Sequence, residues 1–135
     1  MPYYLQGPAG GFLGAPHTVW PPTQDIYKIS AMKGRSSDAI NKLGVDWFND
    51  GNTTTGPEFG GEDGVAFNFA IANDDHLTKI IGYVGGAGPA TVIRGMQFYT
   101  LKDKLSAAYG DTSGTMWTFD SPPGYEIVGL ELRTG

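Results

Sequence analysis

The sequence predicts an all-β protein in which three small sheets pack around one core as a β-prism. Three observations support this prediction. Glycine is frequent, with 21 residues in 135, and aromatic residues reach 13%, a combination typical of short strands joined by tight turns. Strand-like runs alternate with turn signals along most of the chain. A glycine pattern also recurs three times, which indicates a repeated unit.

Seven runs of β-branched, aromatic and alternating apolar residues are expected to form strands, namely 25–32, 42–48, 65–71, 77–84, 91–100, 115–119 and 125–132. Turn-forming residues separate them: Pro21-Pro22, Asn49-Asp50-Gly51, Asn73-Asp74, the glycine-rich stretch 85–89 and Pro122-Pro123-Gly124. Only the segment 100–108 contains a series of helix formers, and it is too short for a convincing helix. The chain is therefore expected to consist of short strands.

The glycines repeat with a period of about 50 residues. A Gly-x-x-x-Gly pattern begins at Gly10, Gly60 and Gly110, and an aromatic residue follows each copy. A strand with an aliphatic pair comes next in each copy, at Ile26/Ile29, Leu77/Ile80 and Ile127/Leu130, and the following strand matches Leu43/Phe48 with Ile93/Phe98. Three copies of one short β unit predict three sheets whose apolar faces meet in one core. The next strand of the third copy would fall beyond Gly135.

The bulk composition indicates one globular domain, 1–135, and excludes several classes of function. Apolar residues make up 40% of the chain and charged residues 17%, so a packed core is expected. The net charge is -5 and the nine Lys and Arg residues are scattered. Nucleic-acid binding needs clustered cations, and so does a basic membrane-surface helix. We therefore expect no nucleic-acid partner and no membrane insertion.

The N-terminal sequence has no basic region followed by a long apolar stretch, so no signal peptide is predicted. A cytoplasmic protein, or one exported by a non-classical route, is expected. The chain has no cysteine, which excludes disulfides and thiolate metal sites. The acidic loop 60–64 has too few oxygen ligands for a calcium loop. No metal and no cofactor are predicted.

The sequence contains no motif that predicts catalysis. His17 and His76, the two histidines, lie far apart and outside any zinc-binding motif, and the cluster Ser36-Ser37-Asp38 has no histidine nearby in sequence. The acidic pairs Glu62-Asp63 and Asp74-Asp75 could suggest a small glycoside hydrolase, which needs two carboxylates converging on one cleft. Adjacent carboxylates on a strand point to opposite faces, so we predict that the protein is not an enzyme.

Two loops have the composition that sugar recognition requires. A neutral sugar offers hydroxyl groups, which a carboxylate accepts from and backbone N–H groups donate to. Glycine allows the tight turns that expose such N–H groups. One loop is 34–38, with Gly34 and Asp38, and the other is 59–64, with Gly60 and Gly61. The alternative is that Asp38 only shapes a turn, as aspartate often does.

The chain resembles the jacalin-related lectins. The resemblance rests on Gly7-Pro8-Ala9-Gly10-Gly11 with Trp20, on Phe59-Gly60-Gly61 and the run 75–83, and on 93–100 with Tyr109-Gly110, Ser113-Gly114-Thr115 and 126–129. The order and spacing of these motifs cover nearly the whole chain. The resemblance implies a β-prism of three antiparallel Greek-key sheets that binds mannose- or galactose-type sugars without a metal.

In this family, the sugar lies between a Gly-Gly loop and a Gly-x-x-x-Asp loop. The best match to that pairing places the sugar at Gly34, Ser36, Ser37, Asp38, Gly60 and Gly61, with Ser36 and Ser37 acting through their backbone N–H groups. The pairing that the family uses most would involve Gly10, Gly11, Arg133 and Gly135. Its aspartate would follow Gly135, so that site is lost, or the C-terminal carboxylate or another chain completes it.

The resulting prediction is a lectin for neutral hexoses, with mannose or glucose first and galactose second. Its partners would be glycans or glycoproteins. Because one monosaccharide makes few contacts, useful affinity would come from several sites or from a homo-oligomer. The alternative is a structural or targeting module with degenerate sugar sites. Among the tryptophans that could stack on a sugar, Trp47 is expected to pack in the core instead.

Overall fold

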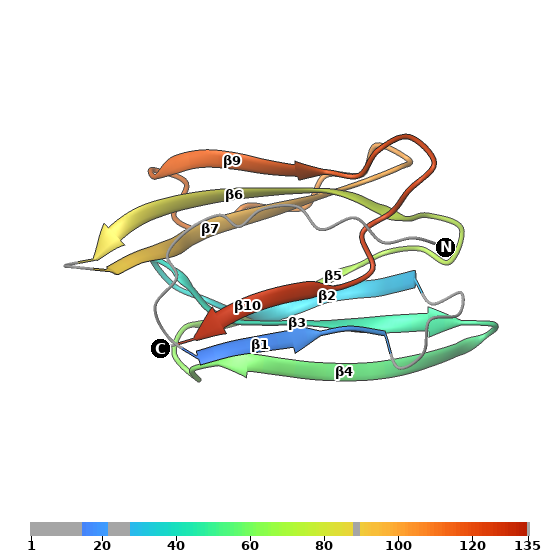
Figure 1. Ribbon diagram of the computed structural model, residues 1–135, viewed down its shortest axis with the longest axis horizontal. Coiled ribbons are helices and arrows are strands. Elements are labelled where there is room, and N and C mark those ends of the chain that lie inside the picture. The colour runs from blue at the N-terminus through green and yellow to red at the C-terminus, as the bar shows by residue number, and fades with distance from the viewer. Residues whose placement is uncertain (1–14, 22–27, 88–89, 135) are drawn as a thin grey trace.

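The described part of the chain forms three antiparallel sheets (Figure 1). The computed structural model describes residues 15–21, 28–87 and 90–134. Its strands are β1 (Ala15–Val19), β2 (Lys28–Ser36), β3 (Ile40–Asn49), β4 (Asn52–Gly60), β5 (Val65–Ala70), β6 (Leu77–Ala87), β7 (Ala90–Thr100), β8 (Tyr109–Gly110), β9 (Thr115–Asp120) and β10 (Leu130–Thr134). No helix long and apolar enough to cross a membrane occurs in these ranges.

Two of the sheets have four strands each and the same topology. The strand order is β4-β3-β2-β5 in the sheet named here sheet II, and β8-β7-β6-β9 in the sheet named sheet III. In both, three consecutive strands are followed by a fourth that returns beside the first, which is the Greek-key arrangement. The described residues of sheet I are β1 and β10, which pair along Ala15–Val19 and Leu130–Thr134. The all-β, antiparallel prediction is therefore confirmed.

The strand registers of sheets II and III correspond pair by pair. Gly34 lies opposite Phe67 in sheet II, as Gly82 lies opposite Trp117 in sheet III. Glycine is needed in both places, because an added Cβ would lie 2.9 Å from the Phe67 ring at Gly34 and 2.1 Å from the Trp117 ring at Gly82. The aromatic ring thus lies across the glycine in each sheet.

The sequence predicted some strands incorrectly. Residues 125–129 are not in a strand, and β10 begins at Leu130. The strands β1, β4 and β8 were not expected. β4 contains Gly56-Pro57, residues that disfavour a central strand but are tolerated on an edge strand and at a bulge, and β4 is both at the edge of its sheet and irregularly paired with β3 near Gly44. The part 25–27 of the first predicted strand lies outside the described residues.

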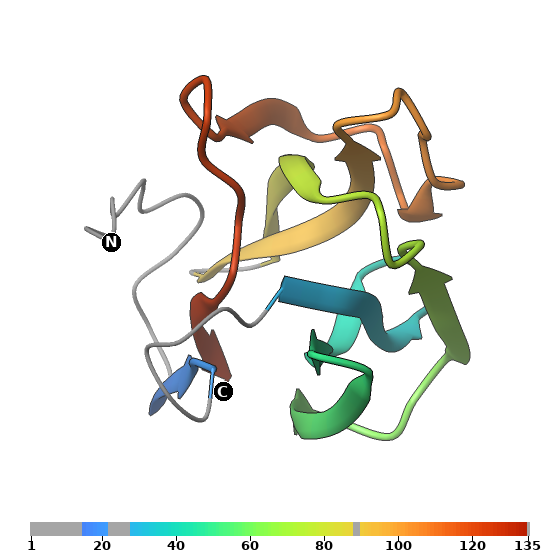
Figure 2. The ribbon, with the colours of Figure 1, turned by 90° about the vertical axis from the view of Figure 1, so that its right-hand side faces the viewer.

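All three sheets contribute to one hydrophobic core, and Figure 2 shows them arranged around it. The fully buried side chains include Val19 of sheet I, Met32 and Val45 of sheet II, and Ile80 and Phe98 of sheet III. Trp47 is also buried, at 2% exposure, which confirms its predicted place in the core. Trp47, Ile80 and Phe98 alternate along their strands with partly exposed residues, as expected when one face of each sheet is covered. Met32 and Val45 each follow a small residue that is buried as well, Ala31 and Gly44.

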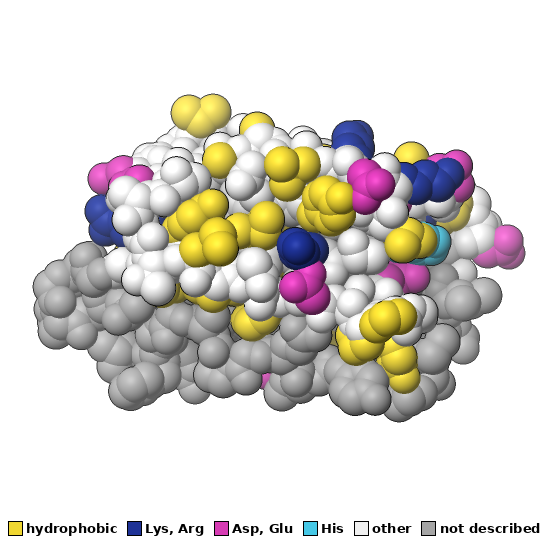
Figure 3. All heavy atoms as spheres, turned by 90° about the horizontal axis from the view of Figure 1, so that it is seen from above, with side chains coloured by type: hydrophobic (Ala, Val, Ile, Leu, Met, Phe, Trp, Pro, Cys, Tyr) yellow, Lys and Arg dark blue, Asp and Glu magenta, His cyan; other side chains and the backbone are white. Residues whose placement is uncertain are grey.

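The outer faces of the two four-stranded sheets differ in polarity. In sheet II, Lys33 and Arg35 of β2 lie on this face, whereas the corresponding positions of β6 in sheet III are Ile81 and Tyr83. Met116 of β9, opposite Tyr83, is 61% exposed. Seen from above, this side of the molecule shows hydrophobic side chains between small groups of charged ones (Figure 3). The two sheets therefore have the same strand topology but outer faces of different polarity.

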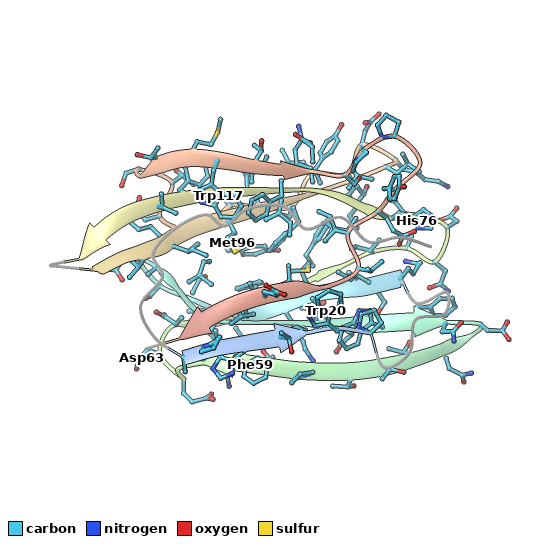
Figure 4. The ribbon with its side chains drawn as sticks, in the orientation of Figure 1. Trp20, Phe59, Asp63, His76, Met96 and Trp117 are labelled. Carbon is cyan, nitrogen blue, oxygen red and sulfur yellow. The ribbon has the colours of Figure 1, made fainter. Side chains whose placement is uncertain are left out.

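The turns of the sheets gather at two ends of the molecule. The turns after β2, β4, β6 and β8 lie at one end, on the left of Figure 1, which is called the loop end below. The turns after β3, β5, β7 and β9 lie at the opposite end. Asp63 is drawn at the loop end and His76 at the other in Figure 4. Both loops that the sequence selected for sugar binding, 34–38 and 59–64, are therefore at the loop end.

Candidate functional site

The first predicted sugar loop is the tight turn between β2 and β3. Gly34 is still within β2 and buried, and a Cβ there would lie 2.0 Å from the carbonyl oxygen of Lys42 on β3. Ser36 is the last residue of β2. Ser37 and Asp38 form the exposed tip of the turn. Glycine at position 34 thus allows the close strand approach, and the polar residues of the loop face solvent.

The second predicted loop connects β4 to β5. Gly60 ends β4 with a φ of 135°, and a Cβ there would lie 2.1 Å from the carbonyl oxygen of Asn41. Gly61 has nothing within 4 Å of the position where its Cβ would be. Gly60 is therefore required by the fold, whereas Gly61 leaves open space beside the loop that a ligand could approach.

Asn41 holds the two loops together. Its side-chain Nδ2 donates a hydrogen bond to Ser37 Oγ at 2.9 Å and another to the backbone carbonyl of Asp63 at 3.1 Å. Its own carbonyl accepts a bond from the Gly61 N–H at 2.7 Å. Ser37 Oγ in turn donates to Asp38 Oδ1 at 3.2 Å. A chain of hydrogen bonds thus runs from the glycine loop to the Asp38 carboxylate, and Asn41, at its centre, was not among the predicted residues.

Charged groups brace the same two loops. The Arg35 guanidinium donates from Nη2 to the carbonyl of Gly64 at 2.7 Å. Lys42 forms an ion pair with Glu62, and the hydrogen bond and charge of that lysine lower the pKa of the Glu62 carboxyl. Glu62 is therefore ionised and paired at neutral pH. Asp38 keeps its carboxylate at the exposed tip of the turn, where it can accept hydrogen bonds from hydroxyl groups.

Two of the backbone donors expected for a sugar are engaged within the protein. The N–H of Ser37 donates to the carbonyl of Ala39 at 3.0 Å, and the N–H of Gly61 donates to Asn41. These two N–H groups are therefore not available to a ligand, whereas the Asp38 carboxylate, exposed at the tip of the turn, is available as an acceptor. The glycine pattern of the sequence does not show which N–H groups of the loops are engaged within the protein.

The other predicted sugar site cannot be described in the same way. Gly10, Gly11 and Gly135 lie outside the described residues. Arg133 lies on β10, paired with Pro16 of β1. The second site thus stays a prediction from the sequence.

Sheet III has a loop equivalent to the glycine loop of sheet II. Gly110 has a φ of 83°, and its Cβ would lie 2.2 Å from the carbonyl of Arg94, as that of Gly60 would lie close to Asn41. The N–H of Asp111 donates to the same Arg94 carbonyl at 2.8 Å. The Asp111 carboxylate accepts from the N–H and hydroxyl of Ser113, both at 2.9 Å, and these bonds lower its pKa. This carboxylate is therefore engaged in shaping its own loop.

The acidic pairs do not form a hydrolytic site. Glu62 is paired with Lys42, and Asp74 with Lys102 at 2.6 Å. Asp75 is buried, and its Oδ1 accepts hydrogen bonds from the backbone N–H groups of His76 and Lys102. Each of these three carboxylates thus has a structural partner. Within the described ranges, no three His, Cys, Asp or Glu side chains gather closely enough to hold a metal ion.

Comparison with known proteins identifies the family. The family model of the jacalin-like lectin domain matches residues 6–135. Artocarpin in complex with methyl α-mannose superposes with a TM-score of 0.83 and 25% identity, over 96% of this chain and 88% of that one.

Two further lectin structures are similar. The mannose-binding lectin from champedak gives a TM-score of 0.81 at 25% identity, over 96% of this chain and 87% of that one. The mannose-specific jacalin-related lectin from Morus nigra, in complex with mannose, gives 0.78 at 24%, over 94% and 83%. A search of curated protein sequences finds no match. Because the family model spans nearly the whole sequence, the chain belongs to the jacalin-like lectin domain family.

Proposed function

We propose that this lectin domain binds neutral hexoses of the mannose or glucose type at the paired loops 34–38 and 60–64, without a metal. Membership of a lectin family makes its activity the binding of carbohydrate and not its conversion. Artocarpin, at 25% identity, has a structure in complex with methyl α-mannose. The champedak lectin, also at 25% identity, is a mannose-binding lectin. These relatives favour mannose over galactose as the first ligand to test.

The observation that carries the proposal is the hydrogen-bonded link between the two loops. Asn41 bonds Ser37 on one side and Asp63 and Gly61 on the other, and Ser37 bonds Asp38. The exposed Asp38 carboxylate is thereby linked through Ser37 and Asn41 to the glycine loop, where Gly61 has open space beside it. A fixed carboxylate can accept from two neighbouring hydroxyls of one sugar ring, which solvent-mobile side chains do poorly.

The test is calorimetric titration of methyl α-mannoside into the wild type, into Asp38→Asn and into Asp111→Asn. The Asp111 variant is the control, because Asp111 is a carboxylate on the loop of sheet III that is equivalent to the glycine loop 60–64. We expect weak binding by the wild type, a loss of about tenfold or more in Asp38→Asn, which corresponds to at least ~1.4 kcal/mol, and no loss in Asp111→Asn.

Two other outcomes would redirect the assignment. Binding that survives in Asp38→Asn would move the sugar away from this loop pair and toward Gly10 and Gly11. A wild type that binds no glycan on an array would favour the structural or targeting module with degenerate sites. Folding of each variant is checked by circular dichroism, so that loss of binding is not mistaken for unfolding.

A further inference from the structure

Val65 is an exposed aliphatic side chain beside the proposed sugar site. It is 75% exposed, the highest value of any large hydrophobic residue in the described ranges. It is the first residue of β5 and directly follows the glycine loop. A single exposed aliphatic residue is ordinary on a protein surface, so the weight here lies on the position of Val65 beside the turn that carries Asp38.

The side chain of Val65 belongs to the inward-facing positions of β5. Phe67 and Phe69, two and four residues further on, are buried in the core, while Ala66 and Asn68 between them are exposed. Because alternate residues of a strand share a face, Val65 lies on the same face as the core residues but beyond the last core layer. Its side chain therefore borders the loop end of the molecule and not the outer wall of sheet II.

Val65 is also adjacent to the residues that hold Asp38. It pairs with Ser36 across β2 and β5. Its neighbour Gly64 is packed so tightly that a Cβ would lie 2.4 Å from the Ser36 carbonyl and 2.8 Å from Asn41 Nδ2. Opposite residues in an antiparallel pair are about 5 Å apart, so Val65 borders the turn that carries Asp38.

The fold itself does not require valine at this position. The equivalent pair in sheet III is Thr115 opposite Val84, at the start of β9. Thr115 is a polar residue and is exposed. The fold thus accepts a polar residue at this position of the strand, although sheet III has its valine, Val84, on the facing strand.

We propose that Val65 forms an apolar subsite next to Asp38, and that the site takes hexosides that carry an apolar substituent beside the bound ring. This inference rests on the proposed function. In it, Asp38 and Ser37 bind hydroxyl groups of the hexose, while Val65 covers an aryl aglycone or another apolar group attached to that hexose. Val65 is then a specificity-determining residue of the site.

The experiment compares methyl α-mannoside with benzyl α-mannoside and benzyl β-mannoside by calorimetric titration. The proteins are the wild type, Val65→Ser and the control Met116→Ser, which removes an exposed hydrophobic residue from the outer face of sheet III. We expect one benzyl glycoside to bind the wild type about three- to tenfold more tightly than the methyl glycoside, the gain expected for covering one aliphatic side chain. That ratio should fall to nearly one in Val65→Ser and stay unchanged in Met116→Ser.

The outcomes separate this inference from the proposed function. Equal affinity of the wild type for methyl and both benzyl glycosides would overturn the apolar subsite, and so would a benzyl preference that persists in Val65→Ser. In both cases, binding of methyl α-mannoside that is lost in Asp38→Asn would leave the sugar site itself standing. Binding of methyl α-mannoside that is unaffected in Asp38→Asn would overturn the proposed site and the subsite together.

Discussion

The indole Nε1 of Trp47 donates a hydrogen bond of 2.9 Å to the carbonyl oxygen of Val128, although 81 positions separate the two residues. Trp47 lies on β3 in sheet II, and Val128 lies in the irregular segment between β9 and β10. The ring also packs against Gly56, where a Cβ would lie 2.7 Å from it. One buried side chain thus connects the segment that leads into sheet I with the core of sheet II.

Replacement of Trp47 by phenylalanine should destabilise the protein by about 2–3 kcal/mol. The variant loses the hydrogen bond and leaves both a cavity and an unpaired carbonyl. The matched control is Trp117→Phe, because the Trp117 indole N–H is buried without a hydrogen-bond partner in the described part of the chain. Trp117→Phe should therefore lower the free energy of unfolding by about 1 kcal/mol less than Trp47→Phe does. Urea denaturation measures both, and equal costs would contradict a stabilising role of the Trp47 bond.

Replacement of Asn41 by alanine should weaken mannoside binding by about tenfold, or ~1.4 kcal/mol. Asn41 contacts both loops of the proposed site but has no need to touch the sugar, so its effect is to hold Ser37 and Asp38 in place. Arg94→Ala changes the equivalent position of sheet III and serves as the control for calorimetric titration. Full affinity in Asn41→Ala would show that the loop link does not position the carboxylate.

Gly61 and Gly64, in the loop between β4 and β5, should differ in their response to replacement by alanine. Gly64 has a φ of 86° and no room for a Cβ, since the Ser36 carbonyl would lie 2.4 Å away. Gly64→Ala should therefore lower the free energy of unfolding by about 1–3 kcal/mol. Gly61→Ala should leave thermal stability unchanged, because its Cβ would meet nothing. A loss of mannoside affinity in Gly61→Ala at full stability would indicate that Gly61 lies against the sugar.

Asp75 should make the protein sensitive to acid. Burial raises the pKa of this carboxyl, but hydrogen bonds from the Thr100 hydroxyl and from the N–H groups of His76 and Lys102 outweigh it, so the pKa in the folded protein is lowered. A lowered pKa stabilises the fold at a pH above the unfolded value of about 3.9, and this stabilisation disappears as the pH falls through the folded value.

Asp75→Asn should accordingly lose about 2 kcal/mol at neutral pH and show a flatter loss of stability below about pH 4. Asp74→Asn is the control, because Asp74 is exposed and only pairs with Lys102 at the surface, where an ion pair contributes little. Denaturant titrations at several pH values between neutral and acid give the slope of the free energy of unfolding against pH for the wild type and for each variant. Identical slopes for the wild type and Asp75→Asn would refute the assignment.

The sequence predicted the class of fold because its signals are local. Alternating apolar residues in 42–48 and 77–84 indicate strands with one face buried in the core. The burial of Val45, Trp47 and Ile80 confirms this interpretation. The resemblance to jacalin-related lectins supplied the Greek-key sheets, which no local pattern contains. β4 was missed because an edge strand can include Gly56-Pro57, which in a central strand would break the pairing.

The details of the site depend on contacts between residues distant in sequence, and these left no readable pattern. Asn41 gains its role only because the turn after β4 brings Asp63 next to it. The amide of Gly61 is engaged by Asn41 for the same reason. A glycine pattern predicts where a loop turns, but not which of its N–H groups the protein itself uses. Asp38 and Gly60 stay predicted site residues until binding is measured.

The pairing of β1 with β10 has a consequence for the order of folding. Sheets II and III each consist of strands that are consecutive in sequence, so their contacts close short loops, whereas sheet I joins residues 15–19 to residues 130–134. Closing the longer loop costs more conformational entropy, about 0.6 kcal/mol for each doubling of loop length, before any contact offsets it. The two Greek-key sheets should therefore assemble early, and the pairing of β1 with β10 should be the slow step that completes the molecule.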